Sequence, residues 1–190
     1  MKATQPSRPG PTIAVVALLT QLLPARAEVV ESGPNGFALQ RTVHIVAAAD
    51  RVYAALIQPA KWWNSEHTFS GSAANLSLDA RAGGCFCETW SGGSVQHLVV
   101  VDAVSGKTLR LRGALGPFQG QGMDGALTFT IKPAGDGADL TMDNIVGGFM
   151  KGGVSKWPPL ADSMLAEQMI RLKRYTETGS PDPEPNRKNP

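Results

Sequence analysis

Hydrophobic and polar residues alternate along much of the chain between residues 37 and 146, a pattern typical of β-strands with one buried face. In residues 37–45, for example, Phe37, Leu39, Val43 and Ile45 alternate with mostly small or polar residues. Six further segments have strand character, namely 76–78, 85–90, 95–101, 108–115, 126–133 and 138–146. Because turn sequences rich in Gly and Ser separate these segments, we expect a curved antiparallel sheet of about seven strands.

Two segments have helical rather than alternating spacing. Asp50 is a suitable N-cap for a short helix that ends before Pro59. A long amphipathic helix is predicted to begin at Pro158–Pro159 and to end at Gly179. Its apolar positions recur at helical spacing and are Ala161, Met164, Leu165, Met169, Leu172 and Tyr175. The predicted fold class is therefore α+β, with the sheet wrapped on the long C-terminal helix and a cavity left between them.

The two ends of the chain differ from this central part. Residues 1–27 have the pattern of a signal peptide, with Lys2 and Arg8 before a 12-residue apolar run and Ala25-Arg26-Ala27 as a cleavage site. The run is too short to span about 30 Å of hydrocarbon as a helix, so we expect cleavage rather than an uncleaved membrane anchor. The predicted organisation is a signal peptide at 1–27, a flexible segment at 28–36, one domain at 37–179 and a disordered tail at 180–190. A periplasmic or secreted protein with no stable membrane span after cleavage is expected.

Charge argues against nucleic acid as a partner. Removal of residues 1–27 leaves 15 basic and 16 acidic residues, a net charge of −1. The remaining chain has no run of basic residues that could neutralise a phosphate backbone.

Most residues capable of specific chemistry lie between Trp62 and His97. If Gly92-Gly93 forms a two-residue hairpin loop, Glu88 pairs with His97 across adjacent strands, whereas a three-residue loop pairs Cys87 with His97. In the first register the carboxylate raises the pKa of the histidine and orients its tautomer, as a general base requires. The alternative interpretation of Glu88 and His97 is a structural ion pair.

The two cysteines give a second, weaker signal. Cys85 and Cys87 point to the same face of an extended strand, with Cα atoms roughly 6.5 Å apart, close to the upper limit for a disulfide. We therefore expect two reduced, half-buried thiols, although an oxidising compartment permits the bond. Only His97 could serve as a third metal ligand, so no metal site is predicted, and no cofactor is expected.

The sequence also resembles a known superfamily. The resemblance rests on three segments and the final helix: Ala49-Asp-Arg-Val-Tyr-Ala-Ala-Leu with Trp62-Trp63, Leu78-Asp-Ala-Arg-Ala-Gly-Gly-Cys-Phe-Cys-Glu-Thr-Trp, and Leu109-Arg-Leu-Arg-Gly. Over residues 37–178 the chain resembles the START-like helix-grip superfamily, also called SRPBCC, and within it bacterial proteins of the polyketide cyclase or Hsp90-activator-like branch. The resemblance implies a fold more firmly than a function, since relatives bind lipids, hormones or polyketides, and some cyclise their substrates.

These observations lead to one expected function and one alternative. We expect an exported protein that holds a small, mostly apolar molecule, such as a lipid or polyketide-like compound, in a cavity between sheet and helix. The alternative is an enzyme of the cyclase or dehydratase type with Glu88 and His97 as its acid–base pair. The residues expected to contact the ligand are Trp62, Trp63, His67, Phe86, Glu88, Trp90, His97 and Phe149.

Overall fold

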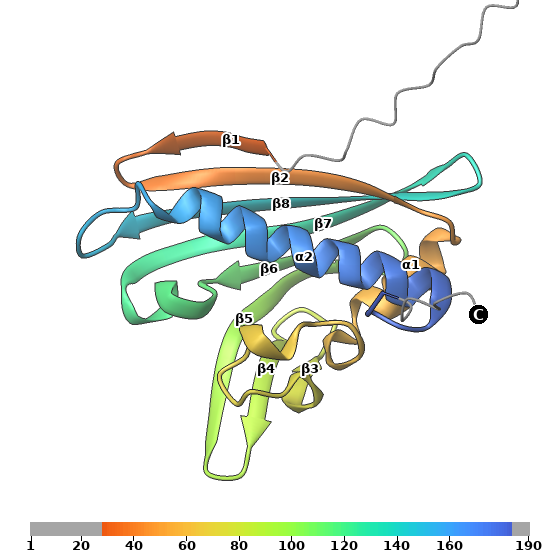
Figure 1. Ribbon diagram of the computed structural model, residues 1–190, viewed down its shortest axis with the longest axis horizontal. Coiled ribbons are helices and arrows are strands. Elements are labelled where there is room, and N and C mark those ends of the chain that lie inside the picture. Colours follow the sequence, from red (N-terminus) through yellow and green to blue (C-terminus); the bar gives the residue numbers. More distant parts are fainter. Residues whose placement is uncertain (1–27, 184–190) are drawn as a thin grey trace, which may run out of the picture.

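The structure is a computed structural model that describes residues 28–183. These residues form one eight-stranded antiparallel sheet and two α-helices (Figure 1). The strands are β1 Glu28–Gly33, β2 Gly36–Ile45, β3 Leu76–Leu78, β4 Cys85–Trp90, β5 Gly93–Val104, β6 Thr108–Gly113, β7 Gly122–Ala134 and β8 Gly137–Phe149. The helices are α1 Ala49–Leu56 and α2 Trp157–Thr178, and short 3-10 turns include η2 Ser65–His67 and η4 Gly116–Gly120. The predicted α+β architecture, a curved antiparallel sheet with a long C-terminal helix, is confirmed.

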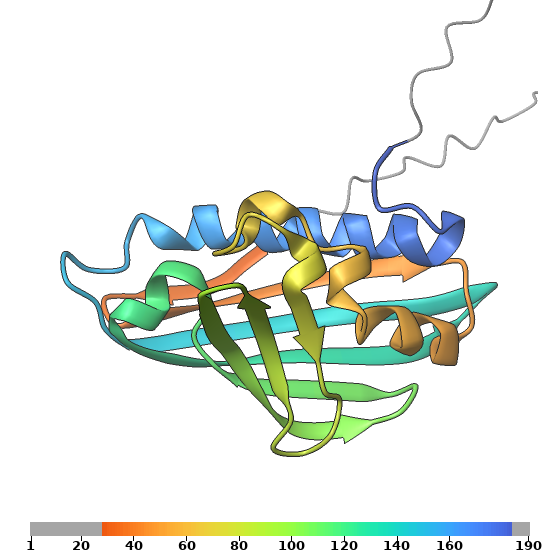
Figure 2. The same ribbon diagram turned by 90° about the horizontal axis from the view of Figure 1, so that it is seen from below.

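The strand order is β1-β2-β8-β7-β6-β5-β4-β3, so β2 and β8 are adjacent although they lie far apart in the sequence. This pairing extends in unbroken register from Gly36 opposite Gly147 to Ile45 opposite Ala138. Helix α2 crosses one face of the sheet, and β4 and β5 curl away from the plane of the longer strands (Figures 1 and 2).

The core lies between α2 and the concave face of the sheet. The predicted helical row is buried at Ala161, Leu165, Met169 and Leu172, whereas Met164 and Tyr175 are only half-buried. Each fully buried large apolar side chain contributes about 1.5–3 kcal/mol, so this row is enough to hold α2 on the sheet. Gly179 ends the helix with a φ of 84°, the left-handed conformation that favours glycine at this position.

Strand β1 differs from the sequence-based expectation. Residues 28–36 were expected to be flexible, but Glu28–Gly33 pairs with β2, for example through Val29 opposite Leu39. The turn residues Pro34 and Asn35 close this hairpin, and Gly36 opens β2. The strand was missed because its three polar and two apolar residues do not alternate, so its pairing with β2 rather than its own pattern defines it.

Two smaller predictions also need comment. Asp50 is not the N-cap of α1, because Ala48 occupies that position and Asp50 lies within the first turn. There its negative charge still interacts favourably with the helix dipole. The predicted signal peptide and residues 184–190 of the predicted tail lie outside the described residues.

Candidate ligand-binding cavity

A cavity of about 800 Å³ lies between α2 and the sheet. Most of its lining is apolar, and five large aromatic side chains contribute to it: Trp63, Phe69, Phe86, Phe118 and Trp157. Phe118 and Trp157 meet edge to face with ring centroids 5.3 Å apart, and Trp63 and Phe86 do so at 5.6 Å. Such contacts fix the rings of the wall in defined orientations.

Part of the cavity lining, at residues 66–69 and at the first turn of α2, is exposed. Four lining residues here are exposed, namely Glu66, His67, Phe69 and Leu160, and the last two have 54% and 57% of their surface exposed. Exposed aromatic and aliphatic side chains at an opening are compatible with entry of an apolar molecule.

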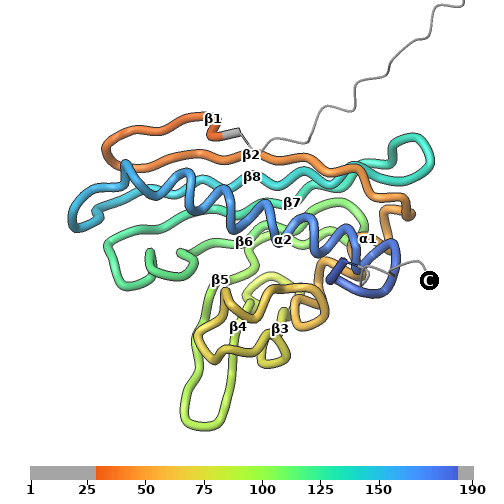
Figure 3. Tube along the Cα trace, in the orientation of Figure 1, coloured from red at the N-terminus to blue at the C-terminus, as the bar shows by residue number. Residues whose placement is uncertain are grey.

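The segment that carries this rim is tied to α2. The backbone N–H of Asn64 donates to Gln168 Oε1 over 2.9 Å, and Arg171 Nε donates to the carbonyl of Trp62 over 2.8 Å. His67 Nε2 lies 3.2 Å from Glu167 Oε2. Figure 3 shows this segment beside the helix. One wall of the cavity is thus held by polar contacts rather than by strand pairing.

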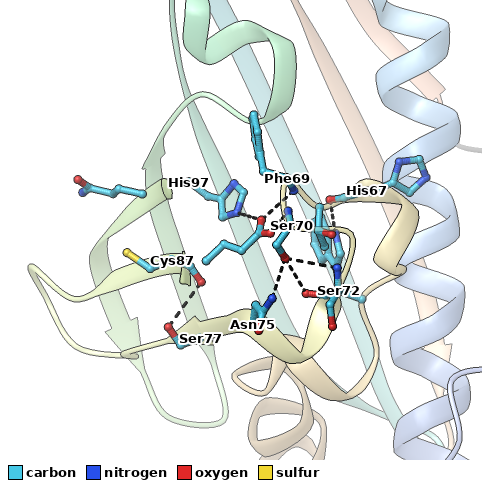
Figure 4. Close-up of polar contacts among 12 residues, drawn as sticks. His67, Phe69, Ser70, Ser72, Asn75, Ser77, Cys87 and His97 are labelled. Carbon is cyan, nitrogen blue, oxygen red and sulfur yellow. Dashed lines mark hydrogen bonds and ion pairs between the residues drawn. The ribbon is translucent and has the colours of Figure 1, made fainter. Parts of the chain in front are cut away.

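A buried carboxylate links the same segment to β4. Glu88 has no exposed surface, and both of its oxygens accept hydrogen bonds. Oε2 accepts from the backbone N–H of Phe69 over 3.0 Å, and Oε1 accepts from that of Ser70 over 2.5 Å. Oε2 also lies 3.1 Å from His97 Nε2. Figure 4 shows the His97 ring and the Phe69 and Ser70 backbone converging on one carboxylate, with His67 well apart beside α2.

A β-bulge places His97 in the cavity wall. Phe86 pairs with Leu98, and Cys87 pairs with Gln96, so His97 is the extra residue between them. His97 and Leu98 are consequently both buried and both line the cavity, although consecutive residues of a regular strand point to opposite faces. The bulge therefore aims the imidazole at the cavity.

Neither predicted hairpin register is correct. The two-residue loop is Ser91–Gly92, because Trp90 pairs with Gly93, and Glu88 pairs with Val95. The Glu88–His97 contact nevertheless exists, because the bulge shifts the register of β5 by one residue before His97.

The charge states of the pair follow from burial and hydrogen bonding. Burial lowers the pKa of His97 below 6.5, although the Glu88 carboxylate acts in the opposite direction. The sequence-based expectation of a raised pKa is therefore wrong. Burial acts to raise the pKa of Glu88, but hydrogen bonds from Ser70, the Phe69 backbone and His97 outweigh it, so this pKa lies below 4.5. At neutral pH the pair is a carboxylate and a neutral imidazole that donates its Nε2–H.

The fold recurs in proteins of known structure. A conserved protein of unknown function from Enterococcus faecalis, EF2215, superimposes with a TM-score of 0.57 at 14% identity, over 87% of this chain and 83% of that one. The Aha1 dimer from Colwellia psychrerythraea gives 0.52 at 16% identity, over 75% and 97%. CalU16 from Micromonospora echinospora gives 0.52 at 15% identity, over 83% and 84%. No protein-family model matches the chain, and no curated protein matches it in sequence.

The chain has the helix-grip fold. At these identities the likeness concerns the fold alone, so the predicted polyketide cyclase or Hsp90-activator-like branch of the helix-grip superfamily stays a prediction.

The helix-grip cavity brings together only some of the residues expected to contact a ligand. Trp63, His67, Phe86 and His97 line it, and Glu88 lies directly behind His97. Three others do not line it: Trp62, Trp90 and Phe149. Trp62 is a core residue whose Nε1–H donates to the Ala55 carbonyl over 3.0 Å, and Phe149 has 76% of its surface exposed.

Several lining residues were not predicted. Asn144 on β8 is the most informative, because it lies in the inward-facing row with Leu140, Met142 and Val146. The sequence did mark Asn144, because it is a polar residue at a position where the alternation of this strand predicts an apolar one. Phe118 and Trp157 also line the helix-grip cavity but come from a 3-10 turn and a helix start, where no alternation marks them.

The cysteines form a disulfide, contrary to the expectation of free thiols. Their Cα atoms are 5.3 Å apart, less than the roughly 6.5 Å of a regular strand. Cys85 and Cys87 point away from the cavity, since Phe86 and Glu88 between and after them point inward.

Residues 28–183 contain neither a cluster of metal-binding side chains nor a helix suited to cross a membrane. No group of three or more His, Cys, Asp or Glu side chains in this range is placed to hold a metal ion. No helix within the same range is long and apolar enough to cross a membrane.

Proposed function

We propose that this protein binds one small, mostly apolar molecule in the cavity between α2 and the sheet. The observation that carries the proposal is the cavity itself, whose volume of about 800 Å³ lies in the range of about 300–1,000 Å³ usual for small-molecule sites. Protein interiors are otherwise close-packed, and an apolar molecule that replaces water in this space gains van der Waals contacts along the apolar lining. A protein that served only to bind other proteins would not need this cavity.

A titration of the full chain with an apolar fluorescent dye, N-phenyl-1-naphthylamine, tests the proposal. We expect binding of one dye per chain by isothermal calorimetry. Met164→Trp places a larger side chain at the cavity wall and should weaken binding at least tenfold. Ile170→Trp is the matched control, because Ile170 lies on the same helix but is exposed and does not line the cavity. Equal affinities for the two variants would contradict the proposal.

A second candidate function has one specific observation in its favour. Because Glu88 accepts the Nε2–H of His97, the neutral ring carries its lone pair on Nδ1, which has no hydrogen-bond partner among residues 28–183. A carboxylate-oriented neutral imidazole in a cavity wall is the arrangement of a general base. It supports a cyclase or dehydratase reaction in which Nδ1 takes a proton from the bound substrate.

The two functions differ in the fate of the ligand. Native mass spectrometry of the purified chain, followed by extraction, identifies any co-purified molecule. If the protein is a carrier, the molecule is recovered unchanged after incubation, and His97→Gln alters its affinity by less than about tenfold. If the protein is an enzyme, wild type converts the molecule, and His97→Gln slows conversion about a hundred- to ten-thousand-fold while binding persists.

We also propose that the protein is exported and that cleavage occurs after Ala27. Support comes from the signal-peptide pattern of residues 1–27. Intact-mass measurement of protein from a cell-envelope fraction should give a chain that begins at Glu28. A mass that includes residues 1–27 contradicts export with cleavage.

A further inference from the structure

The cavity contains a buried amide that no other residue satisfies. Asn144 has 7% of its surface exposed and lines the cavity floor on β8. Its side chain forms no hydrogen bond with any residue of the described range 28–183. Its amide atoms are not among the fully buried unpaired ones, so they face the space of the cavity and are available to a polar group on a ligand.

His97 supplies a second polar position of fixed character. Glu88 fixes the hydrogen on Nε2, so Nδ1 can only accept a hydrogen bond. A ligand group that pairs with Nδ1 must therefore carry a hydrogen to donate, as a hydroxyl does. A ketone or ether oxygen at this position meets a second acceptor and is disfavoured.

The charges around the cavity disfavour an anionic ligand. No Lys or Arg is among its described lining residues, and the lining carboxylate, Glu66, lies at the exposed rim. The buried cation Arg41 lies 3.8 Å from Asp162 and does not line the cavity. The Glu88 carboxylate stands directly behind His97. A carboxylate or phosphate in this space would be desolvated beside a like charge with no counter-ion.

The two polar positions are far enough apart to be reached by the two ends of one molecule. Asn144 lies on β8 and His97 on β5, with β7 and β6 between them. Three strand spacings amount to roughly 14 Å along the sheet surface. The curvature of the sheet shortens the direct distance across the cavity.

From these observations we infer that the cavity selects an uncharged, largely apolar ligand with a hydroxyl at one end, for His97, and a second polar group at the other, for Asn144, and excludes anionic amphiphiles. The inference rests on the proposed binding function and adds the chemical class of the ligand. The aromatic wall further favours a rigid, flat skeleton over a flexible chain, because rings stack on rings with little loss of conformational entropy.

The test uses two probes that differ in one group. 6-Acetyl-2-naphthol is uncharged and carries a hydroxyl and a ketone, and 6-acetyl-2-naphthoate replaces the hydroxyl by a carboxylate. Each is used near pH 7 to displace the apolar dye from the full chain. We expect the naphthol to bind at least tenfold more tightly than the naphthoate.

Two variants assign this preference to the named residues. His97→Phe should weaken naphthol binding at least fivefold and leave naphthoate binding nearly unchanged, because only the naphthol hydroxyl uses Nδ1. Asn144→Leu, of similar size, should weaken both probes by similar factors, because both carry the ketone. Met164→Lys introduces a cation at the wall and should increase naphthoate affinity, which shows that the space admits the larger group.

The possible outcomes distinguish failure of the proposed ligand selectivity from failure of the proposed binding function. Equal binding of the two probes to wild type overturns the inference, and so does dye binding that neither probe displaces; both results leave the binding function intact. Failure of the dye to bind overturns the proposed function instead. The wild-type ratio of affinities stands as a test even if a variant does not fold.

Discussion

The Nε2 atom of His97 lies 3.1 Å from Oε2 of Glu88, and the same carboxylate accepts hydrogen bonds from two backbone N–H groups of the 69–70 segment. Glu88 therefore has two structural roles. It orients the imidazole in the cavity wall, and it anchors the segment that forms the cavity rim. Its removal affects both the site and the stability of the fold.

We expect Glu88→Ala to destabilise the protein by at least about 3 kcal/mol. The substitution removes the acceptor of the Phe69 and Ser70 N–H groups in these part-buried contacts, together with the packing of a fully buried side chain, and a lost hydrogen bond to a charged group costs about 1.5–3 kcal/mol. Glu88→Gln should cost less, because its amide oxygen still accepts one of these bonds. Urea denaturation gives the free energies of unfolding. Thr89→Ala, at an exposed neighbour on β4, should change stability by less than about 0.5 kcal/mol. A similar loss for both alanine variants would show that Glu88 has no anchoring role.

Much of the fold could be predicted from sequence because it depends on local periodicity. The bounds of β3 and β4 agree with the sequence-based ranges, and Gly179 ends α2 as expected. These features depend on alternation, turn residues and a glycine in the left-handed conformation. Strand β1 depends on pairing with β2 instead, and an edge strand without alternation gives no comparable signal.

The site was predictable in its residues but not in its geometry. Glu88 and His97 stood out because they flank a predicted hairpin turn within the segment that holds most residues capable of specific chemistry. Their contact depends on a bulge at His97, and the residue pattern of β5 does not reveal an inserted residue in the ladder. The expected separation of the cysteines assumed a regular strand, and the structure places their Cα atoms closer together. The pKa of His97 was misjudged for a related reason: the depth of its burial could not be estimated without the bulge.

The disulfide should be present in protein isolated under oxidising conditions. We expect Cys85 and Cys87, the only cysteines in the chain, to resist a maleimide reagent in denaturant and to react after addition of a dithiol. Labelling of both without reductant would contradict the bond. Because it closes a very short loop, the double variant Cys85→Ser/Cys87→Ser should lose about 2 kcal/mol or less on the chain-entropy estimate.

A glycine pair tests the backbone at the end of β8, which leads to α2. Gly148 has a φ of 133°, and a Cβ there would overlap the Gly122 carbonyl oxygen. Gly148→Ala should therefore destabilise the protein by about 2 kcal/mol or more. Gly147→Ala is the control, since its Cβ would meet only the Asn35 oxygen at an ordinary 3.5 Å. Thermal unfolding of both variants checks this difference, and equal melting temperatures would count against the strained backbone.

Stability should fall as the pH drops below the ordinary histidine pKa, and His97 should be one cause. Its pKa in the folded protein lies below 6.5, chiefly because of burial, so the unfolded chain binds a proton at a higher pH than the folded one. The contribution of neutral His97 to the free energy of unfolding is complete above the pKa that His97 has in the unfolded chain. This contribution is lost as the pH falls through the pKa of His97 in the folded protein. His97→Phe should therefore reduce the slope of unfolding free energy against pH between about pH 5 and pH 6.5.

His44 provides an internal control of opposite sign. Hydrogen bonds to Asp139 and Asp136 raise its pKa above 6.5, so its contribution is present below the unfolded pKa and is lost as pH rises through the folded pKa. His44→Gln should thus steepen the rise of stability with pH just above 6.5, where His97→Phe has little effect. Urea denaturation across this pH range, together with NMR titration of the two imidazole rings, distinguishes the two contributions. The selection of a hydroxyl depends on a neutral His97 ring whose Nδ1 accepts a hydrogen bond. If the His97 ring titrates at or above pH 6.5 in the folded protein, the ring is mostly protonated near pH 6 and cannot accept that bond there.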